Sequence, residues 1–522
     1  MLRLRLPCTR RRAGAAAAST GFTGIAAFLA SVPASVLTGL VWAIAVLPHL
    51  SLRCFMWEEG NNAELARDVL MRGNWLAPAI FGLRYVEKPP LFAWLIAGTA
   101  SLTGRVNEWS ARLPAILAVL GTALLVERLT RRYATAPAAM FAAGAFMFSP
   151  LVLRKLMVSE PDTLVTFVSF AAFVVWWDGE MAERVTTGRW LVCGGLLTAL
   201  ALIKGPQPIG FFALGAGASL VARRRWHGLA GFALCLALPA AATIAWAGTV
   251  YRPGDLPVWL GYMRLEGTAT MSRYLLERAR FAGSLPLDLL PSTFVLASVY
   301  VLRYRDFDDT ARPVLRALAF YAGLCTLVLL VWPGTKTRYA MPVAPAMAVI
   351  AGLTIGTLWR RRHWTGSVAV ALAGILFAYQ VTLVTLALPR FTEEFDATRR
   401  LGVTIDAVVR EAPAPLFTIE GPHANKLFYV TWPIQALLLP AAATLPAPAW
   451  VVLSQPNLEQ IETARPDLVF QVMATRLPPD LVLARVERRP GEDENLGSRF
   501  LGSIPISPTP RTSREEPRAS GR

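Results

Sequence analysis

Five short polar segments between apolar stretches carry the side chains of this sequence that could do chemistry. They are Trp57-Glu58-Glu59, Tyr85-Val86-Glu87-Lys88-Pro89-Pro90, Ser159-Glu160-Pro161-Asp162, Lys204-Gly205-Pro206 and Lys336-Thr337-Arg338-Tyr339. Carboxylates held at the ends of apolar helices can act as general bases toward a hydroxyl or bind a cation. Converging lysines and arginines can bind a phosphate, and arginine can do so bidentately. The five segments therefore predict a site that brings a phosphate-activated substrate to an acceptor.

Each of these residues also has an ordinary structural explanation. Asp162 or Glu160 could cap a helix and complement its dipole, and an isolated lysine could snorkel to a lipid headgroup. Snorkelling explains less well why four cations share the outer side of the membrane, where the positive-inside rule predicts few basic residues. These cations are Lys88, Lys204, Lys336 and Arg338. The sequence has no nucleotide-binding loop, GxSxG motif or kinase signature, so an activated substrate must bring its own leaving group.

The composition is that of a polytopic membrane protein. Of 522 residues, 54% are hydrophobic and 17% charged, and the mean hydropathy is +0.44. A soluble chain of this size would need more polar surface. The net charge of +17 argues little for nucleic acid, because many arginines cluster at the ends of apolar runs. The five cysteines and four histidines show no metal-ligand spacing, so we expect no zinc site and no resident cofactor, although the sequence leaves a divalent cation open.

Hydropathy predicts eleven membrane spans. They cover about 23–47, 113–127, 136–153, 163–177, 190–203, 208–222, 228–250, 286–302, 315–333, 340–358 and 366–388. With the amino end in the cytoplasm, every arginine cluster falls inside, as the positive-inside rule expects. The five polar segments then lie together on the opposite face.

The same reading predicts four parts of the chain. A basic cytoplasmic N-terminus (1–22) precedes a membrane catalytic domain (23–388) with outer loops 51–112 and 251–285. Within the first loop, 63–70 reads as an amphipathic helix lying along the membrane interface. Residues 389–489 read as a small extracytoplasmic α/β domain, and 490–522 as a disordered tail. The predicted fold class is therefore an all-α polytopic membrane protein with a C-terminal soluble α/β domain.

Several of these motifs resemble the GT-C glycosyltransferases. The similar stretches are Glu58 to Arg67, Gly73-Asn74-Trp75, Tyr85 to Leu91 and Glu108 to Pro114, followed by Pro161-Asp162, Lys204-Gly205-Pro206 and Arg338-Tyr339. Within that group the chain is similar to the bacterial branch of 4-amino-4-deoxy-L-arabinose lipid A transferases and protein O-mannosyltransferase-like enzymes. The resemblance covers about residues 50–360.

The resemblance implies transfer of a sugar from a polyprenyl-phosphate donor to a glycolipid such as lipid A, a glycan or a protein, on the outer face of the bacterial cytoplasmic membrane. Glu58 and Asp162 take the catalytic positions. Lys88, Lys204, Arg338 and Lys336 are assigned to the donor phosphate, and Glu59, Tyr85 and Tyr339 to the lining of the substrate site. No nucleic-acid partner is implied.

The first loop also departs from the family pattern. Where the family usually has Asp-Glu-x-Arg-Tyr, this chain has Glu58-Glu59-Gly60-Asn61-Asn62. The extra methylene of Glu58 moves its carboxylate by roughly 1.5 Å, about one C–C bond, and the site loses a cation and an aromatic ring. Two alternatives to an active transferase therefore stay open: a lipid or glycolipid transporter, and an inactive binding protein derived from the enzyme.

Overall fold

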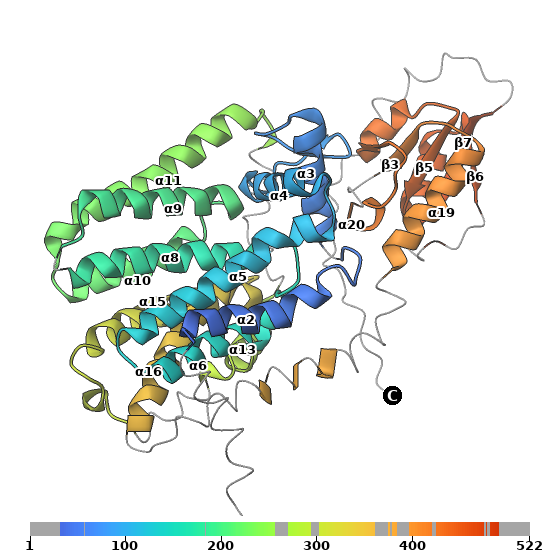
Figure 1. Cartoon of the computed structure of the whole chain (residues 1–522). Coiled ribbons are helices and arrows are strands. Elements are labelled where there is room, and N and C mark those ends of the chain that lie inside the picture. The colour runs from blue at the N-terminus through green and yellow to red at the C-terminus, as the bar shows by residue number, and fades with distance from the viewer. Residues whose placement is uncertain are drawn as a thin grey trace, which may run out of the picture. The chain divides into compact units, whose positions relative to one another are not determined.

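The computed structural model describes residues 32–56, 58–182, 184–255, 270–293, 302–360, 374–375, 378–379, 381–383, 396–419, 424–473, 477 and 481–489. Outside these ranges lie the predicted N-terminus 1–22, the predicted tail 490–522 and most of the predicted span 366–388. The chain divides into two compact units (Figure 1). Unit 1 comprises residues 1–79 and 84–396, and unit 2 comprises residues 80–83 and 397–522.

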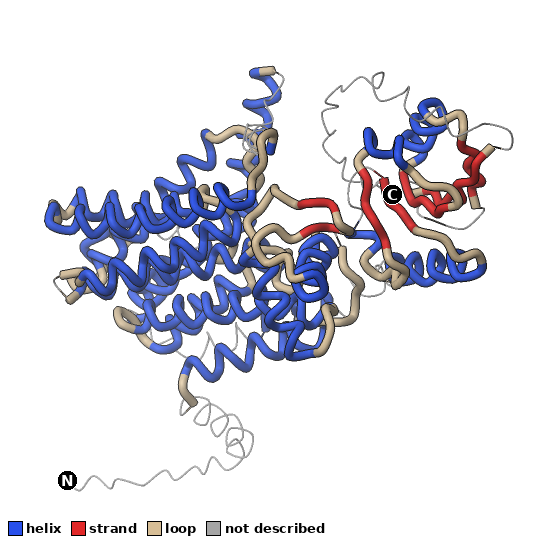
Figure 2. Tube along the Cα trace, turned by 90° about the horizontal axis from the view of Figure 1, so that it is seen from above, coloured by secondary structure: helices blue, strands red, loops and turns tan. Residues whose placement is uncertain are grey.

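Unit 1 is helical (Figure 2). Its α-helices are α2 (Ala34–Val46), α3 (Glu59–Arg72), α4 (Leu91–Thr103), α5 (Glu108–Arg131), α6 (Ala136–Met147), α7 (Pro150–Leu153), α8 (Asp162–Met181), α9 (Thr187–Lys204), α10 (Ile209–Ala222), α11 (Leu229–Val250), α13 (Met271–Asp288), α15 (Arg312–Val331) and α16 (Ala344–Arg360). The 3₁₀ turns are η1 (Leu47–His49), η2 (Trp226–Gly228), η4 (Tyr304–Asp306) and η5 (Thr337–Val343). A short hairpin, β1 (Ala79–Ile80) and β2 (Leu83–Arg84), lies at the division between the units.

Six stretches of the described chain are long and apolar enough to cross a membrane. They are Glu108–Arg131, Asp162–Met181, Thr187–Lys204, Trp226–Val250, Arg312–Val331 and Thr337–Arg360. Each overlaps a span predicted from hydropathy. The count of eleven spans and the orientation of the helices in the membrane stay predictions.

The apolar helices pack side by side (Figure 1). Helix α5 contacts α6, α8 and α16, and α8 also contacts α9, which packs on α11. Glycines allow some of these close approaches: a Cβ at Gly352 on α16 would lie 2.7 Å from the Cβ of Ala142 on α6. Because the apolar surfaces of the helices pack against one another, polar side chains are expected at the helix ends.

The two predicted outer loops contain more helix than the sequence indicated. Loop 51–112 holds α3 and α4, and loop 251–285 holds most of α13. Helix α4 has only 13 residues, too few to register as a span that needs about 20. The predicted helix at 63–70 is part of α3, which packs on α4 and α5 and buries Ala63, Leu65 and Ala66. Its placement along the membrane interface stays a prediction.

Unit 2 is a small α/β structure. Its five-stranded sheet has the order β4-β3-β5-β7-β6, with β3 (Leu416–Ile419) parallel to both β4 (Ile434–Leu437) and β5 (Ala449–Leu453). Strand β7 (Val482–Arg488) runs antiparallel to β5 and to β6 (Leu468–Val472). The helices are α19 (Ala397–Glu411), α20 (Ala424–Leu427) and α21 (Gln455–Ala464), with a 3₁₀ turn η7 (Leu439–Thr444). The predicted extracytoplasmic location of 389–489 stays a prediction.

Candidate active site

Helix ends of unit 1 carry the predicted site residues. Glu58 is the N-cap residue of α3, Asp162 begins α8, Lys204 ends α9, and Lys336 is the N-cap residue of η5. Lys88 lies in the loop just before α4, whose N-cap residue is Pro90. These elements meet, since α3 contacts α4, α4 contacts α9, and α8 contacts η5. Segments separated by up to 280 residues are thus brought to one end of the helical bundle.

Glu58 and Lys88 form the first charged pair. The Lys88 ammonium donates to Glu58 Oε2 at 2.6 Å and lies 3.6 Å from Glu87 Oε1. Lys88 holds the pKa of Glu58 below its usual range. Burial alone would lower the pKa of Lys88, but Tyr85, Glu58 and Glu87 together raise it well above its usual value. Both members of the pair are therefore charged at neutral pH, and the Glu58 side chain stays 39% exposed.

Asp162 and Lys204 form the second charged pair, which is deeper. Asp162 is only 5% exposed, and its Oδ1 accepts from the Lys204 ammonium. That ammonium also lies 5.0 Å from the centre of the Tyr339 ring. Glu160, two residues before Asp162, is paired with Lys155 instead. The structure thus brings Asp162, Lys204 and Tyr339 together and gives Glu160 a separate partner.

Arg338 differs from the lysines of the site. Its guanidinium carbon lies 5.3 Å from the centre of the Tyr339 ring, and its Nε is buried without a hydrogen-bond partner. Among the described residues, no carboxylate lies within ion-pair distance of Arg338, although its charge contributes to the low pKa of Glu58. Lys336 is exposed. Arg338 is therefore a cation at the site that keeps its capacity to bind an anion.

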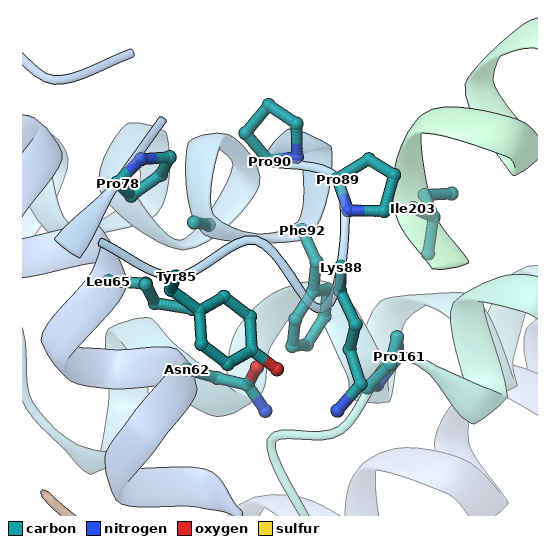
Figure 3. Close-up of a pocket in the computed structure, with 11 residues that line it drawn as sticks. Asn62, Leu65, Pro78, Tyr85, Lys88, Pro89, Pro90, Phe92, Pro161 and Ile203 are labelled. Carbon is teal, nitrogen blue, oxygen red and sulfur yellow. The ribbon is translucent and has the colours of Figure 1, made fainter. Parts of the chain in front are cut away.

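A small pocket opens beside these pairs (Figure 3). Its lining includes Tyr85, Lys88, Pro89, Pro90 and Pro161. Figure 3 shows the Tyr85 hydroxyl, the Lys88 ammonium and the amide of Asn62 directed toward the same side of the pocket. Burial raises the pKa of Tyr85, so its hydroxyl remains a hydrogen-bond donor.

Asn62 was missed in the sequence although a signal for it was present. It stands four residues after Glu58, so both belong to one face of α3. Its amide donates to the Ser159 carbonyl at 2.9 Å and so ties α3 to the segment that leads into Asp162. The asparagine that replaces the family's tyrosine is therefore part of the site's framework.

Glu59 does not line the site, which corrects its predicted place. It is completely buried, and it accepts from Arg112 Nε at 2.8 Å, Arg53 Nη1 at 2.5 Å and the Ser159 amide at 2.8 Å. Arg112 is also completely buried and donates to the Leu50 carbonyl at 2.5 Å. The pair holds three segments together directly behind Glu58. The sequence signal for it is Arg112 itself, because a charge inside an apolar stretch needs a partner.

Glu64, on the buried side of α3, should make the protein's stability depend on pH near neutrality. Burial raises the pKa of Glu64 to about 7, despite its 2.8 Å contact with Arg67. For a carboxyl whose pKa is raised by folding, stability is complete below the unfolded pKa and falls as pH rises toward the folded pKa. We expect Glu64→Gln to remove this loss, so that the variant gains on the parent between pH 5 and pH 8 by roughly 1–3 kcal/mol.

The measurement is the apparent thermal midpoint in detergent for parent and Glu64→Gln at several pH values. Asp309→Asn is the control, since the Asp309 side chain is 87% exposed and should give a constant offset. Parallel curves for parent and Glu64→Gln would contradict the raised pKa.

The described residues include no group of three or more histidine, cysteine, aspartate or glutamate side chains placed to hold a metal ion. What the site does hold is two carboxylates, each with its own lysine, and an arginine for which the described part of the chain offers no carboxylate partner. Such a set can orient a hydroxyl with a carboxylate and neutralise a phosphate with the cations.

Comparisons with known proteins identify relatives that are glycosyltransferases. Residues 87–248 match the family model described as dolichyl-phosphate-mannose-protein mannosyltransferase. An undecaprenyl phosphate-α-4-amino-4-deoxy-L-arabinose arabinosyl transferase from Edwardsiella ictaluri is 32% identical over 64% of this chain and 73% of its own length. Its counterpart from Pseudomonas aeruginosa is 28% identical over 79% of this chain and 73% of its own length.

Solved structures share the fold. The crystal structure of ArnT from Cupriavidus metallidurans in the apo state has a TM-score of 0.64 at 18% identity, covering 90% of this chain and 98% of that one. The same protein bound to undecaprenyl phosphate gives 0.65 at 18% identity, over 89% and 98%. The likeness extends over nearly the whole of both chains.

Proposed function

This chain belongs to the family of the undecaprenyl phosphate-α-4-amino-4-deoxy-L-arabinose arabinosyl transferases, and from that premise we propose how its own residues divide the reaction. It is an integral-membrane glycosyltransferase that uses a polyprenyl-phosphate sugar donor. In our proposal, Arg338, Lys88 and Lys204 receive the donor phosphate, and Glu58 receives the proton of the acceptor hydroxyl. The first donor to test is the one named in its relatives, undecaprenyl phosphate-linked 4-amino-4-deoxy-L-arabinose.

One observation carries the division of roles: both site carboxylates already have a lysine, while Arg338 has no carboxylate partner among the residues described. An incoming phosphate therefore finds an available arginine first. Glu58 is the accessible carboxylate, at 39% side-chain exposure, whereas Asp162 is buried against Lys204. These positions support Glu58 as the group that meets the acceptor and Asp162 as the group that orients Lys204.

The proposed transfer is a single displacement. The acceptor oxygen forms a bond to the anomeric carbon while the bond from that carbon to the phosphate oxygen breaks. The electron pair leaves with the polyprenyl phosphate, whose negative charge Arg338 and the lysines stabilise. The acceptor proton passes to Glu58.

In this proposal, Lys88 sets the order of donor binding and proton transfer. While it contacts Glu58 at 2.6 Å, it is the main cause of the low pKa of Glu58, and a carboxylate with a low pKa is a weak base. A donor phosphate that draws Lys88 away removes that cause. Glu58 then becomes a stronger base only once the donor is bound. It therefore takes the acceptor proton only when the sugar is in place.

The acceptor and the location complete the proposal. We expect a glycolipid such as lipid A, another glycan or a protein as acceptor, on the outer face of the bacterial cytoplasmic membrane. The donor is itself a membrane lipid, so we expect it to reach the site from the bilayer around the apolar helices. Comparing the envelope glycolipids and glycoproteins of parent and deletion strains by mass spectrometry identifies the acceptor.

Replacing Arg338 by methionine should raise the donor KM and lower kcat/KM by about 10- to 1000-fold, because the site loses its available phosphate ligand. Arg338→Lys should recover part of the loss, since lysine keeps the charge but not the bidentate geometry. Transfer from a purified lipid-linked sugar in detergent gives both constants. Lys336→Met is the matched control: it stands two residues away and is exposed, so its effect should be smaller.

A donor KM that stays unchanged in Arg338→Met would remove Arg338 from the phosphate site. The transporter alternative is tested in the same preparation after reconstitution into vesicles. It predicts movement of the lipid-linked sugar across the membrane with no glycosyl transfer.

A further inference from the structure

Helix α13, which fell in a predicted loop, is bound to the end of α15 by side chains. Arg278 on α13 is only 7% exposed, and it donates to the carbonyls of Leu329 at 3.2 Å and Trp332 at 2.5 Å. The hydroxyl of Tyr274, one turn earlier, donates to the Val331 carbonyl at 2.7 Å. Three of the last carbonyls of a membrane-crossing helix are therefore satisfied from one neighbouring helix.

Those carbonyls need such partners. The last four carbonyls of any α-helix lack partners within the helix, and the cost of leaving them unpaired rises near hydrocarbon. An arginine at this place also complements the negative end of the helix dipole. Arg278 can reach several carbonyls at once because its guanidinium carries five donor hydrogens in a fixed plane.

The same arginine extends its hold toward the site. Its Nη2 donates to the carbonyl of Thr335 at 3.3 Å. Lys336 follows directly and is the N-cap residue of η5, in which Arg338 and Tyr339 stand about one turn from that contact. The backbone from Trp332 to Thr335 is thus fixed at both ends by one side chain, and its direction sets where Arg338 lies.

The other end of α13 is anchored near Asp162. Asp288, the last residue of the helix, is 8% exposed and forms an ion pair of 2.7 Å with Arg154. Arg154 directly follows α7 and directly precedes Lys155, which pairs with Glu160. Helix α13 therefore contacts both chain segments that lead into the site, the one before Arg338 and the one before Asp162.

We propose that Arg278 is a positioning residue of the glycosyl transfer, which holds the 332–335 turn so that Arg338 meets the donor phosphate. The inference rests on the role of Arg338 given above. In this proposal, α13 holds the end of α15 in a fixed position relative to the site. The Nη donors of Arg278 bind backbone carbonyls, so the proposal assigns it no contact with the substrate.

The test is a double-mutant cycle with Arg278→Met, Arg338→Met and the double variant, assayed for transfer from a lipid-linked sugar in detergent. We expect Arg278→Met to lower kcat/KM for the donor by about 10- to 100-fold, the scale expected for a misplacement of about 1 Å. The double variant should have about the same kcat/KM as Arg338→Met alone. Once Arg338 has been removed, losing the contacts that position it has no further effect on transfer. Arg280→Met is the matched control, an exposed arginine on the same helix, and it should retain the parent's constants.

The possible outcomes separate the two proposals. Losses that multiply in the double variant overturn the positioning role of Arg278 and leave the role of Arg338 intact. An unchanged Arg338→Met overturns the phosphate assignment itself. If Arg278→Met does not fold, Arg278→Lys replaces it in the cycle, because lysine keeps the charge but cannot bind the carbonyls of Leu329, Trp332 and Thr335 at once; an Arg278→Lys variant with the parent's kcat/KM for the donor then overturns the inference.

Discussion

Glu58→Gln should lower kcat/KM for glycosyl transfer by about 10²–10⁴-fold, the usual contribution of a general base. Glutamine keeps the size of the side chain and can still accept a hydrogen bond from Lys88, so the pocket should keep its shape. It cannot take the acceptor proton. The loss should therefore appear in kcat more than in the donor KM, which separates Glu58 from the phosphate ligands.

Glu87→Gln provides the matched control for this variant. Glu87 also lies near the Lys88 ammonium, at 3.6 Å, and its side chain is 31% exposed. Removing its charge perturbs the electrostatics of Lys88 without removing the carboxylate that contacts Lys88 at 2.6 Å. Equal losses in Glu58→Gln and Glu87→Gln would show that charge near Lys88, and not the base, is what matters.

Glu58→Asp tests the departure from the family pattern. Aspartate is the usual family residue, but in this chain the Lys88 ammonium is placed for a glutamate, and shortening the side chain withdraws the carboxylate by roughly 1.5 Å. We expect Glu58→Asp to be less active than the parent. A Glu58→Asp variant with a higher kcat/KM than the parent would instead show that glutamate at this position lowers the rate of transfer.

The sequence could reveal the charged ends of helices but not the direction in which each side chain points. Glu58, Asp162 and Lys204 stand out because each borders an apolar stretch, where a charge needs a reason. Glu59 carries the same signal as Glu58, yet the two point to different surroundings because successive residues of a helix are turned by about 100°. Arg112, 53 residues along the chain, decides which of them is buried.

Other parts of the framework left weaker traces. The partners of Arg278 are backbone carbonyls, which carry no sequence signature, so its role could not be foreseen from residue types. Helix α4 was not predicted because its 13 residues are too few for a membrane span. Hydropathy located the six stretches of the described chain that are long and apolar enough to cross a membrane, because burial in lipid constrains composition. The side-chain contacts between helices depend on geometry alone.

Breaking the buried pair of Glu59 and Arg112, which lies next to the site, should greatly lower the stability of the protein. Glu59→Gln leaves a fully buried Arg112 without its counterion, and such a loss typically costs about 3–5 kcal/mol. Asp309→Asn, which removes an exposed partner of Arg312, should cost about 0–1 kcal/mol. The apparent thermal midpoints of both variants in detergent measure the difference.

The pH dependence gives the pair a second signature. Burial by itself would raise the pKa of Glu59, but Arg112 and Arg53 outweigh it and lower that pKa to about 2. For a carboxyl whose pKa is lowered by folding, the stabilisation is complete above the unfolded pKa, near 4.5, and is lost as pH falls toward 2. The parent should therefore lose stability relative to Glu59→Gln only below about pH 5, opposite in direction to the effect of Glu64.

The activity of these variants distinguishes positioning from mere stability. Glu59 binds the Ser159 amide at 2.8 Å, three residues before Asp162, and it directly follows Glu58. If the pair sets the distance between the two carboxylates, Glu59→Gln should lower kcat even at temperatures where the variant is fully folded, and Arg112→Lys should recover part of kcat by restoring the charge. A folded Glu59→Gln enzyme with the parent's kcat would confine the pair to stability, and the separation of Glu58 from Asp162 would then have to be fixed by Asn62 and its 2.9 Å contact with the Ser159 carbonyl.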